Sequence, residues 1–331
     1  SVAAYHGYNF LLAKENLTDH LPIEIREKKI RHRLLKIRAK KVVNATGSIE
    51  RPLIFDNNDR PGIFISSAIK RYADLYGVAC GEKNILFTNN DSAYETAISL
   101  IQKGINVKAI IDNRENVDSK LIYEAEKNNI KIFKGFTVVD TSGYKRIKKI
   151  SIMQLSKDGQ KVVGSKKNLH CDCLGVSGGW TPAVHLFTQS GGKLKFREVD
   201  SVFIPNEFPS NQISVGSCNG DFFLDEILIN VPKSLQKFLK IKNSEYDNIE
   251  VSSSINKSNR NIWLLPSDKT FGKTKPFVDY QNDATAKDIK LALREGFRSI
   301  EHVKRYTTTG MGTDQGKLGN MHALGIISET A

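Results

Sequence analysis

The sequence predicts an α/β protein, and two observations carry that prediction. Residues 84–112 read as strand, turn, helix and strand, and they end in an acidic residue. Strand-like and helical periods then continue to alternate over residues 119–133. Strands that are joined through helices in this way run parallel and form βαβ units. The spacing of the first unit is that of half a dinucleotide-binding domain.

Size and composition are those of a globular protein of two or three domains. The chain has 331 residues, of which 40% are hydrophobic and 26% charged, and this excludes extensive disorder. No apolar run reaches the roughly 18–20 residues that span a bilayer, so we expect no membrane partner. The chain begins at Ser1 without a recognisable leader and stops at Ala331, and we expect a segment of a longer protein.

The number of cysteines indicates the cellular compartment, and the distribution of charge indicates which classes of partner to expect. Four scattered cysteines are too few for a disulfide framework and favour a reducing cytoplasm. Lys and Arg number 49 against 36 Asp and Glu, a formal net charge of +13. The basic residues are spread along the chain, without a stripe interleaved with aromatic residues. We therefore interpret the charge as a solvated surface and expect no nucleic acid partner, with polyanion binding as the alternative.

The first 80 residues are predicted to be mostly β structure. Alternating segments indicate short strands at Ala3–His6, Phe10–Lys14 and Leu34–Arg38. The apolar run 41–47 indicates a buried strand that ends in a glycine. Residues 51–62 are dense in turn formers and predict a loop, and Ser66–Tyr76 has the period of a helix.

The βαβ unit has no phosphate-binding turn. Its strand Asn84–Thr88 is followed by a turn without glycine, whereas close approach to a pyrophosphate requires glycines. We expect the carboxylate of Asp91 to occupy the helix N-terminus where an anion would bind. Asp112, at the end of the second strand, is the one residue that could accept a ribose hydroxyl. The pattern favours a degenerate, structural unit over a nucleotide site.

The predicted structure of the second half of the chain changes twice. Residues 135–176 resemble antiparallel hairpins, one of which turns at Asp158-Gly159. Residues 233–275 are rich in Lys, Ser and Asn and predict a linker or loosely packed extension. The last part is predicted to be helical, at Thr285–Glu295, at Ser299–Tyr306 and from about Asn320.

Two glycine turns are the candidates for cofactor contact. Thr46 and Gly47 follow the buried strand, and Val215–Asp221 is a second strand-to-turn segment with two glycines before a predicted helix at Phe223–Ile229. Backbone N–H groups in such turns can bind a phosphate. The alternative is that both are ordinary turns.

The other reactive side chains predict neither a catalytic centre nor a metal site. Cys171 and Cys173 lack the CxxC spacing of redox or metal sites, and their alternation with apolar residues indicates a buried strand. His185 and His302 have no cysteine or acid at triad or ligand spacing. The residues alone therefore indicate an α/β nucleotide fold, with no catalytic and no metal-binding residue.

Several longer segments together carry a family resemblance. They are residues 44–52, 57–62, 87–94, 176–182, 277–283 and 301–311. In combination they resemble the α subunit of heterotetrameric sarcosine oxidase, nearly from end to end, with residues 233–275 the least similar. The resemblance implies an FAD/NAD(P)-binding Rossmann-like fold with two dinucleotide-binding domains and a small C-terminal helical domain.

The resemblance also implies an activity and its cofactors. Members of this family oxidatively demethylate sarcosine to glycine and pass the methylene group to tetrahydrofolate. FAD and FMN are expected on the partner β subunit, NAD on the α subunit, and tetrahydrofolate in a C-terminal domain that this sequence lacks. The glycine-rich fingerprint that opens the family's NAD site is also missing. We therefore expect a central fragment that supplies NAD binding and assembly with the β, γ and δ subunits, and that is inactive alone.

The resemblance assigns cofactor contacts to seven residues. They lie beside the adenine, in the turn after the buried strand and in the final turn that closes on NAD. They are Val2, Thr46, Gly47, Gly216, Ser217, Phe222 and Phe223.

The domain boundaries expected from the resemblance are as follows. Residues 1–80 and 170–232 form an incomplete NAD domain, and residues 81–169 form a degenerate Rossmann-like domain. Residues 233–275 form the linker, and residues 276–331 form the helical domain.

The helical domain resembles one that holds a [2Fe–2S] cluster in related amine and opine dehydrogenases. Asp279, Gln281 and Asp314 stand where three of the cluster's thiolates would be. Oxygen ligands do not replace thiolates, so we expect no cluster and a domain that packs against a partner subunit.

Two other functions stay open at this stage. One is the corresponding subunit of an N-methylglutamate or opine-type amine dehydrogenase, which would use the same architecture on another secondary amine. The other is a non-catalytic scaffold on a degenerate nucleotide fold, an alternative that the glycine-free turn after Thr88 leaves open.

Overall fold

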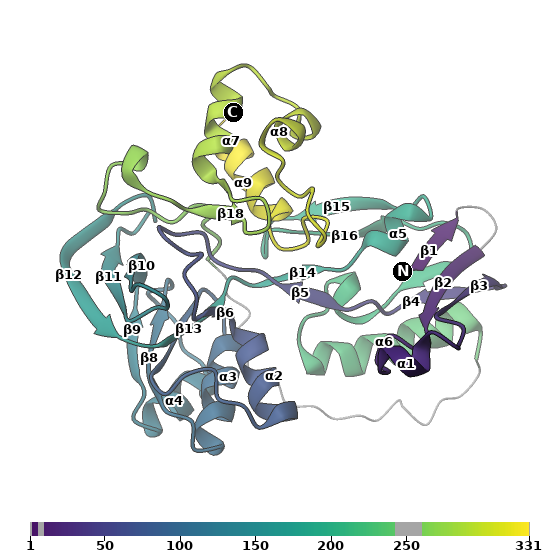
Figure 1. The fold of residues 1–331 in the computed structure, drawn as a ribbon, viewed down its shortest axis with the longest axis horizontal. Coiled ribbons are helices and arrows are strands. Elements are labelled where there is room, and N and C mark those ends of the chain that lie inside the picture. The colour runs from purple at the N-terminus through teal and green to yellow at the C-terminus, as the bar shows by residue number, and fades with distance from the viewer. Residues whose placement is uncertain (1, 6–9, 242–259, 331) are drawn as a thin grey trace. The chain divides into compact units, whose positions relative to one another are not determined.

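The computed structural model describes residues 2–5, 10–241 and 260–330, which form two compact units (Figure 1). Unit 1 comprises Ser1–Ser48 and Trp180–Ser253. Unit 2 comprises Ile49–Gly179 and Ser254–Ala331. Within the described ranges, no helix combines the length and the apolar character that crossing a bilayer requires.

A five-stranded parallel sheet forms the centre of unit 2. Its strands lie in the order β6 (Ile63–Ile65), β13 (Cys173–Ser177), β7 (Asn84–Thr88), β8 (Val107–Asp112) and β9 (Lys131–Lys134). Every residue of β7 and of β13 is buried, as expected for strands of a parallel sheet that is covered on both faces.

The position of β13 corrects one prediction. Residues 135–176 were expected to form antiparallel hairpins, and residues 136–170 do so, but the chain then returns at Cys173 and inserts between β6 and β7. Its run of small and apolar residues is compatible with burial on both faces, which an antiparallel strand with one solvated face does not require.

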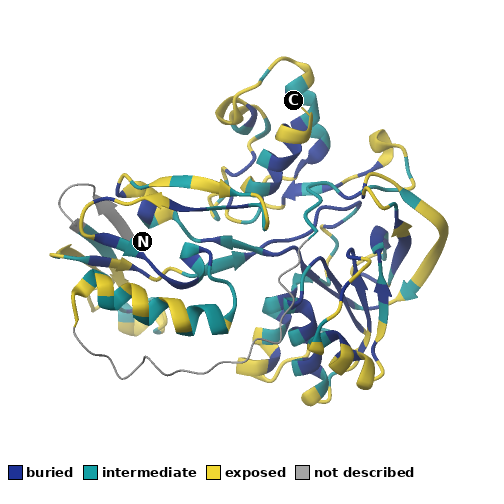
Figure 2. Cartoon of the chain, turned by 180° about the vertical axis from the view of Figure 1, so that it is seen from behind, coloured by how far each residue is buried: buried dark blue, intermediate teal, exposed yellow. Residues whose placement is uncertain are grey.

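Helices cover one face of this sheet and a second sheet covers the other. The helices are α2 (Ser66–Tyr76), α3 (Ser92–Gln102) and α4 (Lys120–Lys127), and they confirm the predicted alternation. The second sheet contains β10 (Phe136–Ser142), β11 (Lys149–Leu155) and β12 (Val162–His170). Side chains alternate along β7, so Leu86 packs with the helices while Ile85 and Phe87 pack with the second sheet. Figure 2 shows the central strands of the parallel sheet, β7 and β13, in dark blue, as buried.

The C-terminal part of unit 2 is a small helical subdomain with its own core. It contains η2 (Phe271–Lys273), β18 (Phe277–Asp279), β19 (Ala284–Thr285), α7 (Ala286–Arg294), α8 (Ile300–Thr307) and α9 (Asn320–Thr330). A capping box between Thr285 and Asp288 begins α7. Its core includes Ile289, Val303 and Ile326, and Ile54 from the start of unit 2 joins them. The predicted C-terminal helices are thus confirmed.

The prediction of a loose linker over residues 233–275 is wrong for the residues that the structure describes. A helix extends through Leu239, and residues 242–259 lie outside the described range. Residues 260–275 are packed onto unit 2, where Leu265 is buried and its N–H donates to the carbonyl of Ile54 at 2.9 Å. Lys269 Nζ lies 2.7 Å from both Asp56 and Asp140. Ion pairs and backbone hydrogen bonds anchor this segment, and a low apolar content does not reveal them.

The described part of unit 1 combines small sheets with short and long helices. An antiparallel sheet contains β1 (Val2–Tyr5), β2 (Phe10–Asn16) and β3 (His32–Arg38). The strand β4 (Val42–Asn44) pairs in parallel with β17 (Gln212–Ser214), and β15 (Lys193–Arg197) forms a hairpin with β16 (Val202–Glu207). The remaining elements are α1 (Ile23–Arg26), β14 (Trp180–Pro182), α5 (His185–Gln189), η1 (Gly216–Asn219) and α6 (Leu224–Leu239), with β5 (Ser48–Glu50) at the boundary of the units.

The compact units divide the chain at residues that differ from the predicted domain boundaries. Residues 49–80 and 170–179 were expected in the first domain, and they lie in unit 2. The reason is that β6 and β13 are strands of the parallel sheet of unit 2.

Gly178 provides a test of the packing beside β13. Its N–H donates to the carbonyl of Arg51 at 2.7 Å, and a Cβ at this position would lie 2.2 Å from the carbonyl oxygen of Pro52. We expect Gly178→Ala to lower the free energy of unfolding by about 1–3 kcal/mol, because the contact is with backbone. Urea denaturation measures this. The control is Gly272→Ala, where a Cβ meets nothing within 4 Å. Equal stability of the two variants would contradict the packing.

Candidate functional site

Ligands of open α/β sheets bind at the carboxyl ends of the parallel strands. The described residues form two such edges. One lies in unit 2, where β7, β8 and β13 end, and the other lies in unit 1, where β4 and β17 end.

In unit 2, polar side chains tie the turn after β7 to β13. The Asn90 amide donates to the Ser177 carbonyl at 3.2 Å and to its hydroxyl at 3.1 Å. Asn90 Oδ1 accepts from the N–H of Ser92 at 3.0 Å, at the start of α3. Asn90, and not Asp91 as predicted, therefore supplies the side-chain acceptor at this helix N-terminus.

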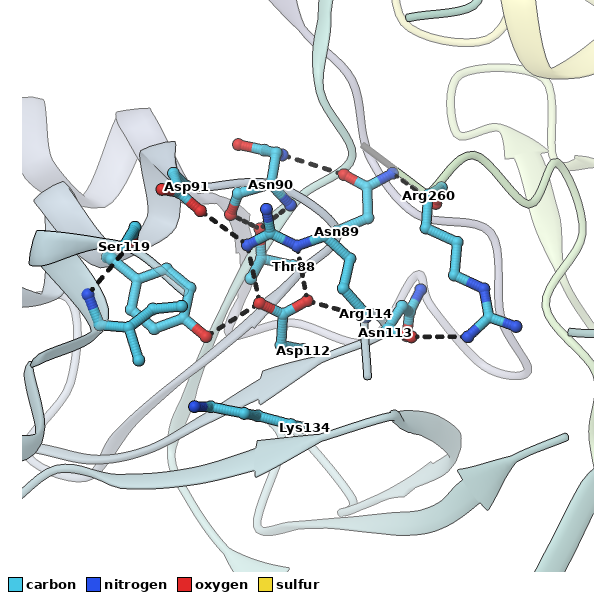
Figure 3. A network of polar contacts seen from close by, with 12 residues as sticks. Thr88, Asn89, Asn90, Asp91, Asp112, Asn113, Arg114, Ser119, Lys134 and Arg260 are labelled. Atoms are coloured by element: carbon cyan, nitrogen blue, oxygen red, sulfur yellow. Dashed lines mark hydrogen bonds and ion pairs between the residues drawn. The ribbon is translucent and has the colours of Figure 1, made fainter. Parts of the chain in front are cut away.

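The carboxylates of Asp91 and Asp112 are neutralised within the protein. Figure 3 shows the Arg114 guanidinium between them. Arg114 Nη2 lies 2.8 Å from an oxygen of each, and Arg114 Nε donates to Asp112 Oδ1 at 3.0 Å. The Tyr94 hydroxyl donates to Asp112 Oδ2 at 2.8 Å. Burial, and then the charge of Asp112, raises the pKa of Tyr94, which keeps this donor protonated.

This cluster overturns the reading of Asp112 as a ribose ligand. The residue is fully buried, and both of its carboxylate oxygens bind Arg114, while one of them also binds Tyr94. A buried charge must be paired and hydrogen-bonded, so this carboxylate stabilises the interior of the protein and does not bind a ribose.

A segment from far along the chain covers the same edge. Arg260 Nη1 donates to the carbonyl of Asn113 at 3.0 Å, and Nη2 donates to the carbonyls of Ser156 and Lys157 at 3.0 and 2.8 Å. Asn89 donates to the carbonyl of Arg260 at 3.1 Å. With no glycine in the turn and its charges paired, the edge of unit 2 does not fit a dinucleotide.

The edge in unit 1 is built differently, because two glycine turns lie side by side. Asn44 and Ser214 are register partners, and the carbonyl of Asn44 accepts from the N–H of Val215 at 2.9 Å. Gly47 and Gly216, in the two turns that follow, have φ values of +76° and +69°. A Cβ on Gly47 would have Ser217 Oγ as its nearest neighbour at 4.0 Å, and a Cβ on Gly216 would meet nothing within 4 Å. Both turns therefore border open space.

Two buried polar atoms precede these turns. Asn44 Nδ2 and Ser214 Oγ are buried and have no hydrogen-bond partner among the described residues. Buried polar groups are normally hydrogen-bonded, so an unpartnered pair at a ligand-binding edge fits a polar ligand. Open glycine turns beside them fit the approach of a phosphate.

The predicted cofactor residues have different positions. Thr46, Gly47, Gly216 and Ser217 come together at this edge, and the Thr46 hydroxyl donates to the carbonyl of Ala183 at 2.6 Å. The other three lie as follows: Phe222 has its ring 5.8 Å from the Arg197 guanidinium, Phe223 precedes α6, and Val2 pairs with Ala13 in the sheet of β1 and β2 while its side chain is outside the described part.

In the helical subdomain, the three residues compared with thiolates are hydrogen-bond acceptors. Asp279 accepts from the N–H of Gly310 at 2.7 Å, Gln281 from the Thr313 hydroxyl at 2.9 Å, and Asp314 from the N–H of Gly316 at 3.0 Å. Asp279 and Gln281 thus tie the loop 308–316 to residues 279–281. The part of the chain that the structure describes holds no group of three His, Cys, Asp or Glu side chains placed to bind a metal.

The remaining reactive side chains are structural or exposed. Burial raises the pKa of Cys171 to about 12, so its thiol is inert. Cys173 is buried in β13, and His185 and His302 are exposed.

Sequence reasoning did not find His322. This residue is buried in α9, with its ring 5.8 Å from Trp263 in an edge-to-face arrangement. Burial, and then the charge of Arg51, lowers its pKa to about 3. The sequence signal for its burial was its position in a run of apolar residues.

The chain is similar in sequence to proteins described as sarcosine oxidase. Residues 273–331 match the family model described as the sarcosine oxidase A3 domain. The chain is 33% identical, over 99% of its length, to sarcosine oxidase subunit alpha of Corynebacterium sp. strain P-1. It is also 33% identical, over 94% of its length, to the protein of that name from Rhizobium meliloti strain 1021. The chain is a relative of the sarcosine oxidase α subunit. It spans 34% and 29%, respectively, of the length of these two relatives.

Solved structures confirm the predicted fold class. L-proline dehydrogenase from P. horikoshii matches with a TM-score of 0.64 at 19% identity, over 99% of this chain and 58% of that one. Thioredoxin reductase from Lactococcus lactis matches with a TM-score of 0.51 at 14% identity, over 72% of this chain and 73% of that one. The fold of this sarcosine oxidase α-subunit relative is thus the FAD/NAD(P)-binding Rossmann-like α/β fold, with the small helical domain at its C-terminal end.

His322 predicts a pH dependence of stability. Its pKa in the folded protein is about 3, against 6.5 for an ordinary histidine, so the unfolded chain binds the extra proton between these values. The free energy of unfolding should therefore fall as the pH drops below about 6.5. We expect His322→Gln to flatten this fall by up to about 1.4 kcal/mol per pH unit.

Urea denaturation between about pH 7 and 5 measures this slope. His302→Gln, which changes an exposed histidine, serves as the matched control and should keep the wild-type slope. A His322→Gln variant with the wild-type slope would show that the residue is not held neutral.

Proposed function

We propose that this chain is part of an oxidoreductase that acts on the CH–NH group of sarcosine. The observation that carries the proposal is the 33% identity, over 99% of the chain, to a protein named sarcosine oxidase subunit alpha. The reaction is the oxidative demethylation of sarcosine to glycine, with the methylene group passed to tetrahydrofolate. The amine chemistry belongs to FAD and FMN on the β subunit, and tetrahydrofolate belongs to a further domain of the α subunit.

Within this assembly, unit 1 is proposed to bind NAD. Three features support this: the paired turns at Gly47 and Gly216, the open space beside them, and the unpartnered Asn44 Nδ2 and Ser214 Oγ. The N–H groups of the turns would hold the phosphates, and Asn44 would donate to a polar group of the cofactor. A nicotinamide dinucleotide supplies hydride transfer where it is bound, and this chain supplies the holding contacts.

Unit 2 is proposed to serve assembly. The edge where a second dinucleotide would bind is filled by the Asp112–Arg114 cluster and covered by Arg260. Its partners would be the β, γ and δ subunits of a heterotetramer in the cytoplasm.

The NAD proposal is tested at Gly216. We expect Gly216→Val to weaken NAD binding at least tenfold, because the new side chain would fill the space above the turn. Equilibrium dialysis of the full-length protein against NAD measures this.

The matched control is Gly77→Val, at another left-handed glycine with nothing within 4 Å, in unit 2. It carries the same backbone strain without touching the turns. Equal losses in the two variants, or no binding of NAD by the wild type, would refute the NAD site.

The substrate is tested in the complex. We expect the full-length protein, purified with its flavin-bearing partner, to oxidise sarcosine with a kcat/KM at least tenfold above that for N-methylglutamate. The opposite preference would show that the chain belongs with the N-methylglutamate or opine-type dehydrogenases. No oxidation of either amine by a flavin-loaded complex would favour the scaffold function.

A further inference from the structure

The antiparallel sheet of unit 1 ends in an edge strand whose outer side pairs with no described residue. This strand is β3 (His32–Arg38), and among the described residues it pairs with β2 alone (Figure 1). The pairing runs over all seven residues of β3 without a register shift, so the strand is long and regular. An edge of this kind is a template for a further strand, because one side of its backbone is unpaired.

The hydrogen bonds to β2 show which backbone groups of β3 point outward. The N–H of Leu17 donates to the carbonyl of Arg31 at 3.0 Å, and these two residues continue the register of the two strands. In an antiparallel pair, residues that exchange hydrogen bonds alternate with residues whose N–H and C=O groups point away. The backbone groups of His32, Leu34 and Lys36 therefore lie on the outer side, and no hydrogen bond joins them to a described residue.

One face of β3 carries exposed apolar side chains. Side chains alternate along a strand, so Leu35 and Ile37 share a face, opposite Ala13 and Leu11 of β2. Leu35 is 38% exposed and Ile37 is 40% exposed. Arg33, on the same face, forms an ion pair with β2. Apolar side chains of an added strand would remove Leu35 and Ile37 from water, which is favourable.

The other face of β3 is cationic. It carries Lys36 and Arg38, and also His32, which lies 3.4 Å from Asp19. Lys36 is exposed and forms no ion pair with any described residue. Residues 26–41, which include the strand, contain nine Lys or Arg and one acidic residue. This face therefore favours a partner that carries negative charge.

The charge of this edge determines which strand can be added. A second copy of β3 would place like charges opposite one another, which destabilises strand pairing. Residues 26–41 contain no Phe, Trp or Tyr, so a single-stranded nucleic acid would find no aromatic ring on which its bases could stack. A strand in which acidic and apolar residues alternate would complement the cationic face, the apolar face and the backbone edge together.

We propose that β3 is the docking edge for an extended acidic segment of a partner protein. The segment adds to the sheet as a further strand and exchanges hydrogen bonds with the outward N–H and C=O groups of β3. Its acidic side chains lie beside Lys36, and its apolar side chains lie beside Leu35 and Ile37. This interaction is independent of NAD binding at the glycine turns and of the assembly role of unit 2.

The first test measures binding of a labelled peptide of alternating Glu and Val to the full-length protein by fluorescence anisotropy. We expect this peptide to bind at least about tenfold more tightly than the peptide in which Lys replaces Glu, because the cations of β3 repel the latter. It should also bind more tightly than an oligothymidylate of equal net charge. No binding of the acidic peptide, or tighter binding of the oligothymidylate, would overturn the proposal.

N-methylation of the peptide separates strand pairing from simple attraction of charge. One version of the acidic peptide is methylated at the backbone nitrogens of its Glu residues, and another at those of its Val residues. Only one of these two sets of N–H groups points toward β3, since the backbone groups of a paired strand alternate in direction. We expect one methylated peptide to bind at least about tenfold more weakly than the other, because it alone loses the hydrogen bonds to β3. Equal affinities would contradict strand addition.

Two pairs of variants complete the test with the same acidic peptide. Leu34→Pro removes an outward N–H, which an edge strand tolerates, whereas Leu34→Ala keeps it, and we expect the proline variant to bind at least about fivefold more weakly. Lys36→Glu should bind at least about fivefold more weakly than Lys108→Glu, which makes the same change of charge at an exposed lysine on β8 of unit 2. Equal affinities within either pair would refute docking at β3. Thermal melting shows that each variant is folded.

Discussion

The need to neutralise two buried carboxylates governs unit 2. Asp91 and Asp112 lie at the carboxyl ends of β7 and β8, away from water, and Arg114 neutralises both with hydrogen bonds of 2.8 Å. Removing one member of such a group would leave an unpaired buried charge, at a cost of about 3–5 kcal/mol. The edge of the sheet that binds dinucleotides in other α/β proteins is therefore committed to holding the fold together.

The C-terminal segment depends on the same edge. Arg260 donates to the carbonyl of Asn113, the residue between Asp112 and Arg114, and to the carbonyls of Ser156 and Lys157. Nine residues after Arg260 the chain is anchored again, where Lys269 lies between Asp56 and Asp140. Trp263 then packs against His322 of α9. A segment of low apolar content thus links the helical subdomain to the rest of unit 2 through charge pairs, backbone hydrogen bonds and one aromatic contact.

In unit 1, by contrast, polar atoms at the strand edge have no partner within the described chain. Its parallel pair, β4 and β17, ends in two glycine turns with space beside them, and the polar atoms of Asn44 and Ser214 before the turns have no partner in the described chain. Unsatisfied polar atoms are features that a ligand can satisfy, and these two lie in unit 1, whereas the polar groups at the edge of unit 2 are satisfied within the protein.

The sequence by itself determined the local elements and their class. Helical and strand periods predicted α2, α3, β7, β8 and the C-terminal helices, and the missing glycines after Thr88 predicted a degenerate unit. These signals are local, because backbone conformation depends on neighbouring residues and on the period of burial. Only the tertiary structure decided that β13 inserts beside β7, that Asp112 binds Arg114 and Tyr94 and no ribose, and that Gly47 lies beside Ser217. Each of these outcomes depends on which residue from a distant part of the chain pairs with a strand edge or a buried charge. The spacing of residues along the sequence does not determine that pairing.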